Sequence, residues 1–139
     1  MLSGIGEGVE ELHALGTRVA LLTHNPSYVV DYYRQMFGFD DAEGVRAQTT
    51  DGGRIGPPKD VRADKAGGLR ALLARTGVEP RTVAHVGDGW SDAEVFRLVG
   101  GGIALNSSLA EVNGAADRVV RTRDFRDVVH ALRTLSPRT

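Results

Sequence analysis

The stretch VGDGWSD, Val86 to Asp92, decides how this chain folds around its candidate site. The apolar run TVAHV precedes it and AEVFRLV follows, a pattern that predicts a buried strand, a tight turn and a helix. Gly87 and Gly89 permit the turn. Asp88 and Asp92 flank it, and two neighbouring carboxylates repel each other unless a cation lies between or beside them. The pair therefore indicates a hard divalent cation such as Mg²⁺, which takes oxygen ligands.

The two carboxylates also have a purely structural interpretation. An acid in the first turn of a helix, as Asp92 would be, is favoured by the helix dipole by about 0.3–1 kcal/mol. Asp88 would then serve as the cap of that helix. The two aspartates by themselves do not distinguish a cation site from an ordinary helix start, so other residues of the chain are needed.

The composition narrows the function classes. With 139 residues and 41% hydrophobic content, the chain is expected to form one globular domain over residues 1–139. Seventeen basic and eighteen acidic residues provide no basic stripe, so we expect no nucleic-acid partner. No apolar run approaches the roughly 20 residues that span a bilayer, and we expect no membrane partner. The absence of cysteine and of a visible signal peptide fits a cytoplasmic location, and the oligomeric state is left open.

Apolar strands and amphipathic helices alternate along the chain. Near-continuous apolar strands separated by helices predict an α/β fold, a three-layer α/β/α Rossmann-like core with a mainly parallel sheet. Such sheets bind ligands beyond the carboxyl ends of their strands. The strands are expected at 18–23, 45–50, 82–87, 102–105 and 117–121, and the helices at 6–15, 26–38, 63–77, 91–98, from about 108, and 125–135, with a turn at 51–53.

Two further residues favour the ligand-binding interpretation. Thr23 directly follows the strand VALL, where its hydroxyl can donate a hydrogen bond to an anion at the edge of the sheet. Lys65 stands near the start of a predicted helix. Lysine is rare in this chain, with only Lys59 and Lys65 among seventeen basic residues. Its compact charge can neutralise a phosphate and a carboxylate together, which suits an anion site.

The order of these features resembles the haloacid dehalogenase superfamily, and more closely its phosphoserine phosphatase-like members. LLTHN at 21–25 resembles the second motif of that family, Lys65 the third and VGDGWSD the fourth. The segment AADRVVRTRDFRDVVHAL is also similar to the end of these phosphatases. The likeness extends from about Gly8 to Leu132.

The resemblance implies a Mg²⁺-dependent phosphomonoester hydrolase that acts on a small phosphorylated metabolite. It implies that Asp88 and Asp92 hold the metal, Asp92 directly or through water, and that Lys65 and Thr23 are catalytic. Ser91 stands where such phosphatases tend to carry asparagine, and the two residues after Thr23 replace small ones. The phosphate contacts implied by the resemblance are Thr23, His24, Asn25, Lys65 and Ser91.

The front of the chain departs from the family pattern. Members begin with a strand that ends in DxDxT, whose first aspartate attacks phosphorus, and no strand of this chain ends that way. The helical cap that sets specificity is also absent. We therefore expect residues 1–139 to correspond to the core of such an enzyme without its nucleophile strand and cap, and to be nearly inactive alone.

Two alternatives remain open. A phosphate-binding pseudophosphatase would keep the anion site without a nucleophile. A serine hydrolase would use Ser91 in a loose nucleophile elbow, with Asp117 or Asp127 and then His130 in the order that such hydrolases follow. The second alternative leaves Thr23 and Lys65 without a role.

Overall fold

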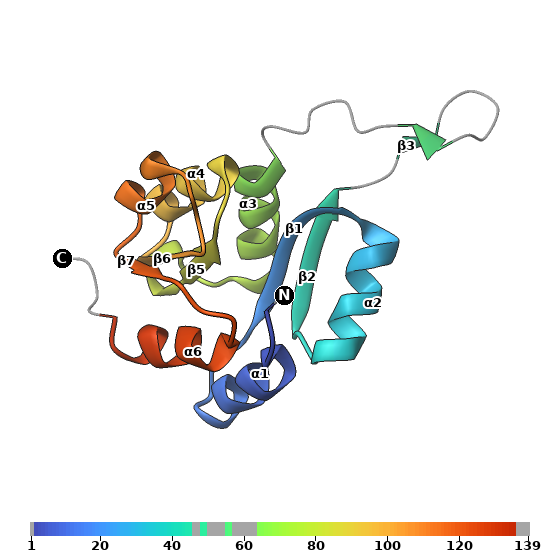
Figure 1. Cartoon of the computed structure of the whole chain (residues 1–139). Helices are drawn as coiled ribbons and strands as arrows, with labels where there is room; N and C mark the ends of the chain where they lie inside the picture. Colours follow the sequence, from blue (N-terminus) through green and yellow to red (C-terminus); the bar gives the residue numbers. More distant parts are fainter. Residues whose placement is uncertain (1, 46–47, 50–54, 57–63, 136–139) are drawn as a thin grey trace.

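The computed structural model describes residues 2–45, 48–49, 55–56 and 64–135. Helices and strands alternate through most of this range, as the pattern predicts (Figure 1). The helices are α1 Ile5–Ala14, α2 Ser27–Phe37, α3 Asp64–Thr76, α4 Trp90–Leu98, α5 Ala110–Ala115 and α6 Phe125–Arg133, with a 3₁₀ turn Pro80–Thr82, and the strands are β1 Ala20–Pro26, β2 Asp41–Val45, β3 Gln48–Thr49, β4 Ile55–Gly56, β5 Ala84–Gly87, β6 Gly101–Leu105 and β7 Arg118–Val120.

The parallel strands form two separate sheets. β6 lies between β5 and β7 and is parallel to both, while β1 pairs in parallel with β2. β3 and β4 make a short antiparallel pair. Among the described residues, β1 and β5 are not joined in one ladder. The fold is α/β with parallel sheets, as predicted, but the strands that lead to the two halves of the candidate site belong to different sheets.

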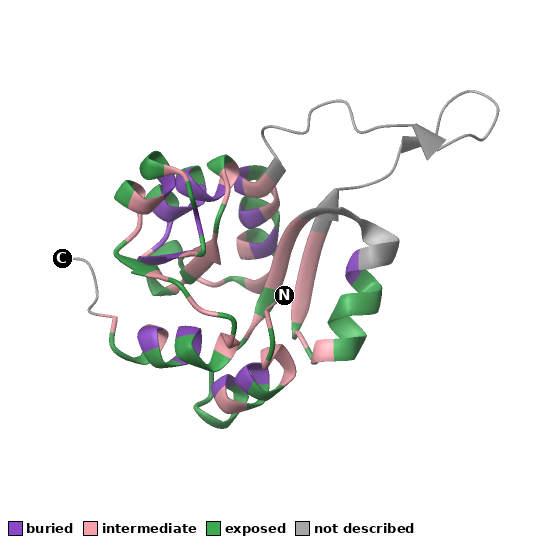
Figure 2. Ribbon diagram, in the orientation of Figure 1, coloured by how far each residue is buried: buried purple, intermediate pink, exposed green. Residues whose placement is uncertain are grey.

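Helices cover both faces of β6. Ile103 packs against α6, whereas the next residue, Ala104, packs against α4 and α5, because successive strand side chains point to opposite faces. Figure 2 shows this part of the sheet as the most continuously buried. A third cluster connects the two sheets on the face of α3 and α4, and it contains Leu22, Leu69, Leu73, Val83, Val95 and Val99.

Helix α3 forms in spite of two consecutive glycines, as predicted. A Cβ atom on Gly68 would lie 2.8 Å from Leu22 Cδ1 in β1 and 3.2 Å from Glu43 Cγ in β2. The missing side chain therefore lets the helix approach the two-stranded sheet closely. At the other end of α3, Arg75 donates hydrogen bonds to Asp41 and Glu43 of β2. Close packing and ion pairs outweigh the helix propensity lost at glycine.

Two predicted boundaries are wrong. The range 45–50, expected to be one strand, contains β3 Gln48–Thr49 and Val45, the last residue of β2, while β2 itself begins earlier because pairing with β1 and the contacts of α3 start at Asp41. Tertiary pairing overrides the β-branched residues that suggested a later strand. Pro26 ends β1 rather than opening α2, which begins at Ser27. The turn expected at 51–53 lies outside the described residues.

Within the described ranges, none of the helices has both the length and the apolar character needed to cross a membrane.

Candidate active site

The carboxylate of Asp92 is the centre of the candidate site. It is completely buried and accepts four hydrogen bonds. Lys65 Nζ and His85 Nε2 contact Oδ1 at 2.8 and 2.7 Å, and the backbone amides of Asp88 and Gly89 donate to Oδ2, each at 3.0 Å. The side chains of Lys65 and His85 are only 16% and 12% exposed. Asp92 thus ties α3, β5 and the turn after β5 to the first turn of α4.

Glycine at position 87 makes room for this carboxylate. A Cβ atom there would lie 2.1 Å from Asp92 Cγ, which no packing can accommodate. His85 is two residues earlier in β5 and therefore faces the same side of the strand. Its ring also packs against Phe96 of α4, with 5.6 Å between the ring centroids. On the side of β5 that faces Asp92, the strand therefore has the imidazole of His85 and, at Gly87, no side chain.

The hydrogen bonds keep Asp92 ionised. Burial by itself would raise the pKa of this carboxyl, because the charged form loses its hydration. The hydrogen bonds from His85 and Lys65, together with the amide of Gly89 and the charge of Lys65, outweigh burial and hold the pKa of Asp92 well below its ordinary value. The buried group is a carboxylate paired with a lysine ammonium, and not a neutral acid.

This geometry tests the structural interpretation of the two aspartates. Asp92 does reach back to the amide of Gly89, the residue that caps α4, as one half of a capping box does. Asp88 is not the cap. Its side chain is exposed, and the described residues contain no hydrogen bond or ion pair to its carboxylate. The structure therefore gives the two acids different environments, one saturated and one available.

Ser107, which follows β6, also holds the turn after β5. Ser107 is 1% exposed, and its Oγ donates a 2.8 Å hydrogen bond to the backbone oxygen of Asp88. The same Oγ accepts a hydrogen bond from the amide of Leu109 at 3.2 Å. Sequence reasoning missed both Ser107 and the role of His85. A serine two residues after the strand 102–105 and a histidine two residues before Gly87 in the same strand were the available signals.

The remaining predicted residues belong to β1 and to the first turn of α4. Thr23 is half-buried in β1, and His24 and Asn25 belong to the same strand, but the side chains of these last two lie outside the described part of the structure. Ser91 is half-buried in the first turn of α4. The structure brings Lys65, Asp92 and the Asp88 turn into direct contact. The phosphate-binding roles of Thr23, His24, Asn25 and Ser91 stay predictions.

The residues of the serine hydrolase alternative are dispersed. Asp117 accepts a hydrogen bond from the amide of Gly102, and Asp127 accepts one from Thr122. His130 is exposed on α6, which covers the opposite face of β6 from α4, the helix that contains Ser91. Among the described residues no hydrogen bond joins Ser91 to His130. This arrangement does not favour a Ser-His-Asp triad.

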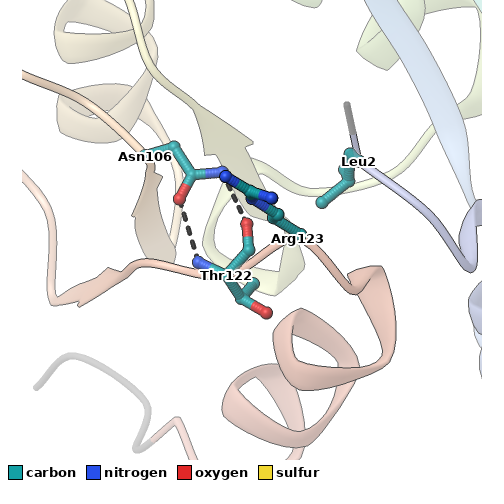
Figure 3. A pocket seen from close by; sticks show the side chains of 4 residues that line it. All are labelled: Leu2, Asn106, Thr122 and Arg123. Carbon is teal, nitrogen blue, oxygen red and sulfur yellow. Dashed lines mark hydrogen bonds between the residues drawn. The ribbon is translucent and has the colours of Figure 1, made fainter.

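A small pocket opens at the ends of β6 and β7, as Figure 3 shows. Asn106 has a left-handed backbone with φ of 55°, and its side chain pairs with the backbone of Thr122 through bonds of 2.8 and 2.9 Å. Leu2 and Arg123 complete the pocket. Because both polar atoms of the Asn106 side chain are satisfied within the protein, this strand-end residue serves the sheet and not a ligand.

The side chains at this site that could act as metal ligands suit a cation only in part. No cluster of three or more His, Cys, Asp or Glu side chains that could hold a metal occurs in the described ranges. Asp92 has no free acceptor position, whereas the exposed carboxylate of Asp88 does. Mg²⁺ is commonly held by one or two carboxylates with water and substrate phosphate. Of the two aspartates at this turn, Asp88 fits such a role as a direct ligand.

Comparison with known proteins places this geometry in context. The family profile described as haloacid dehalogenase-like hydrolase matches residues 1–100. The phosphoserine phosphatase of Haemophilus influenzae is 28% identical over 90% of this chain and 40% of its own length. A phosphoglycolate phosphatase of Methanopyrus kandleri is 29% identical over 86% of this chain and 50% of its own. The chain thus spans half or less of the length of these relatives.

Solved structures show the same fold. A phosphoserine phosphatase in its apo form superposes with a TM-score of 0.77 at 23% identity, over 97% of this chain and 67% of its own. A probable phosphoserine phosphatase from Vibrio cholerae superposes with a TM-score of 0.70 at 27% identity, over 94% of this chain and 43% of its own. Nearly all of the chain, and only part of each of these proteins, is shared.

Proposed function

This chain belongs to the haloacid dehalogenase-like hydrolase family, and we propose that it supplies the core of a Mg²⁺-dependent phosphomonoester hydrolase of the phosphoserine phosphatase type. The observation that carries the proposal is the buried Lys65–Asp92 pair, which holds the Asp88 turn so that one exposed carboxylate remains available. The substrate is a small phosphorylated metabolite, and the location that we propose is the cytoplasm.

In this proposal each residue has one task. Asp88 is the direct metal ligand, and a bound Mg²⁺ would neutralise charge on the phosphoryl oxygens. Asp92 positions Asp88 by accepting hydrogen bonds from the backbone amides of the turn, and it does not bind the metal itself. Lys65, fixed by Asp92 at 2.8 Å, places a positive charge beside the same turn. Thr23, with His24, Asn25 and Ser91, supplies hydrogen bonds to the phosphate.

Charge stabilisation of this kind does not supply an attacking group. Members of the family react through an aspartyl phosphate, which divides one displacement into two easier steps. Lys65 and Asp92 are bonded to each other, and Asp88 is assigned to the metal. None of these three residues is left to act as the nucleophile, so water would have to attack. Residues 1–139 assayed alone are therefore expected to show little or no turnover.

The test is a pair of phosphatase assays. Residues 1–139, and a form with a DxDxT strand placed upstream, are assayed on phosphoserine, phosphoglycolate and p-nitrophenyl phosphate with and without Mg²⁺. We expect Mg²⁺-dependent turnover only in the restored form and a loss of at least about 10²-fold in its Lys65→Ala variant, because charge stabilisation contributes on that scale. Robust turnover by residues 1–139 alone would show that the nucleophile assignment is wrong.

A non-catalytic phosphate-binding module is the second candidate. Saturation of Asp92 favours it, because only one aspartate of the pair is left for a cation. This candidate predicts that inorganic phosphate binds to residues 1–139, that the binding weakens in Lys65→Ala, and that the restored form stays inactive on a broad panel of phosphate esters. Calorimetry combined with the assays above separates the two functions.

A further inference from the structure

Two arginines flank the carboxyl end of β6. Arg121 donates a hydrogen bond of 3.1 Å from Nη2 to the backbone oxygen of Ser107, and Arg123 lines the pocket beside Asn106. Thr122 stands between them and directs its hydroxyl toward the start of α6. Because side chains alternate along an extended chain, the two arginines point away from that helix. Both guanidinium groups therefore lie on the side of the loop that follows β6.

Neither guanidinium forms an ion pair with an acid in the part of the chain that the structure describes. The acids of the same segment are already engaged, since Asp124 forms an ion pair with Arg126 at 2.7 Å and Asp127 accepts a hydrogen bond from Thr122. An arginine side chain has five N–H donors, and the bond to the backbone after β6 occupies only one nitrogen of Arg121. Both arginines are exposed. Their positive charges are thus available to an anion from solution.

The pocket gives such an anion room beside these charges. Its volume is about 500 Å³, and Leu2, Asn106, Thr122 and Arg123 line it (Figure 3). The side chain of Asn106 is saturated by the backbone of Thr122, and Leu2 is apolar. Arg123 therefore supplies the ionic recognition in this lining. A guanidinium matches the planar carboxylate group, which it can bind through two parallel hydrogen bonds.

The pocket lies beside the candidate site. Gly87 pairs with Ala104 in register, so Asp88 follows β5 next to the end of β6. Ser107 joins the two places, because its Oγ donates to the backbone oxygen of Asp88 while its own backbone oxygen accepts from Arg121. β5 and β7 are two strand spacings apart, which is about 10 Å. A long arginine side chain that extends from the end of β7 can therefore meet a small molecule whose phosphate is held at Asp88.

We propose that Arg121 and Arg123 form a subsite for a carboxylate, and that the substrate is a phosphate ester whose alcohol part carries this second anionic group. The inference rests on the proposed function, because the phosphate of such an ester would be held at Asp88 and Lys65. A carboxylate satisfies the guanidinium groups with charge-assisted hydrogen bonds, whereas an uncharged alcohol leaves both charges without a partner. The subsite therefore selects phosphorylated hydroxy acids over esters of uncharged alcohols of the same size.

The test compares two ligands of similar size on residues 1–139. Phosphoglycolate carries the carboxylate, and ethyl phosphate has a methyl group in its place. Calorimetry in the presence of Mg²⁺ measures both affinities for the wild type and for Arg121→Gln, Arg123→Gln and Arg118→Gln. The last variant is the matched control, because Arg118 is also exposed but lies at the opposite end of β7, where its guanidinium contacts the backbone oxygen of Thr134. It removes the same charge without touching the subsite.

We expect the wild type to bind phosphoglycolate on the order of tenfold more tightly than ethyl phosphate, the scale of a charge-assisted hydrogen bond. Arg121→Gln and Arg123→Gln should each lower this ratio toward one and leave the affinity for ethyl phosphate unchanged. Arg118→Gln should keep the ratio of the wild type. Equal affinities for the two ligands in the wild type, or an equal fall of the ratio in Arg118→Gln, would overturn the subsite while leaving the proposed function intact.

Failure of the proposed function gives a different result. If neither ester binds, the phosphate site at Asp88 and Lys65 is wrong, and glycolate without phosphate then tests the subsite. The readout is the NMR signal of each arginine Nε–H group. Glycolate should shift the signals of Arg121 and Arg123 and leave that of Arg118 in place. Unchanged signals, or equal shifts at all three arginines, would overturn the carboxylate subsite together with the phosphate site.

Discussion

The strands β6 and β5 have similar apolar sequences, yet they differ in how completely they are buried. β6 has a parallel neighbour on each side and helices on both faces, and four of its five residues are buried. β5 is paired with β6 alone among the described residues, and it is exposed or half-buried throughout. The comparison teaches that an apolar strand in this fold is buried by its neighbours and not by its own composition.

The turn after β5 also differs from β5 itself in how many interactions hold it. The turn after β5 is held by four hydrogen bonds to one buried carboxylate, while the strand that leads to it is paired on one side only within the described ranges. The site is thus organised from the side of α3 and α4 and not from the side of β1. Mutations should therefore have large effects at Asp92 and small effects on exposed positions of the helices around it.

The largest effect is expected from Asp92→Ala. Removal of the carboxylate leaves Lys65 and two backbone amides without an acceptor in a buried place, and breaking a buried ion pair costs about 3–5 kcal/mol. Urea unfolding measures the loss. Glu94→Ala, at an exposed position of the same helix, is the control and should change the unfolding free energy by less than about 0.5 kcal/mol. Similar effects of both variants would mean that the pair does not stabilise the turn.

The pH dependence of this contribution follows from the lowered pKa of Asp92. A carboxylate with a depressed pKa in the folded state stabilises the protein fully above its unfolded pKa, about 3.9, and loses that contribution as the pH falls toward the folded value. The difference in unfolding free energy between the wild type and Asp92→Asn should therefore be constant from about pH 5 to 7 and shrink below about pH 4. If the difference stayed constant down to about pH 2.5, well below the unfolded pKa, Asp92 would not have a lowered pKa in the folded protein.

A pair of glycines tests the packing on a smaller scale. A Cβ atom on Gly102 in β6 would lie 2.6 Å from Phe96 Cδ1, so Gly102→Ala should overpack the core and cost about 1–3 kcal/mol. Gly67 in α3 has open space around its Cα, and Gly67→Ala should stabilise the helix by about 0.5–1 kcal/mol. Thermal unfolding of both variants checks the opposite signs. A stabilised Gly102→Ala would show that Phe96 can move away from β6.

Local patterns predicted much of the fold because the decisive interactions are short-range. The strand at 82–87 and the helix at 91–98 were expected, and the structure contains β5 Ala84–Gly87 and α4 Trp90–Leu98. The break between them follows from glycine and from the acid in the first helical turn. β2 was misplaced because its start is set by pairing with β1, a contact between residues about twenty positions apart.

Sequence reasoning placed Lys65, Asp88 and Asp92 in the candidate site but missed His85 and Ser107. The sequence by itself determined that Lys65, Asp88 and Asp92 would meet, since a parallel sheet gathers strand ends and helix starts at one edge. Only the tertiary structure decided that Asp92 is saturated and Asp88 exposed, because that depends on His85 and Gly87 sharing a strand face and on α3 delivering Lys65. It also decided that β1 and β5 belong to different sheets in the part of the chain that the structure describes, since strand pairing joins distant segments and leaves no local signal in either one.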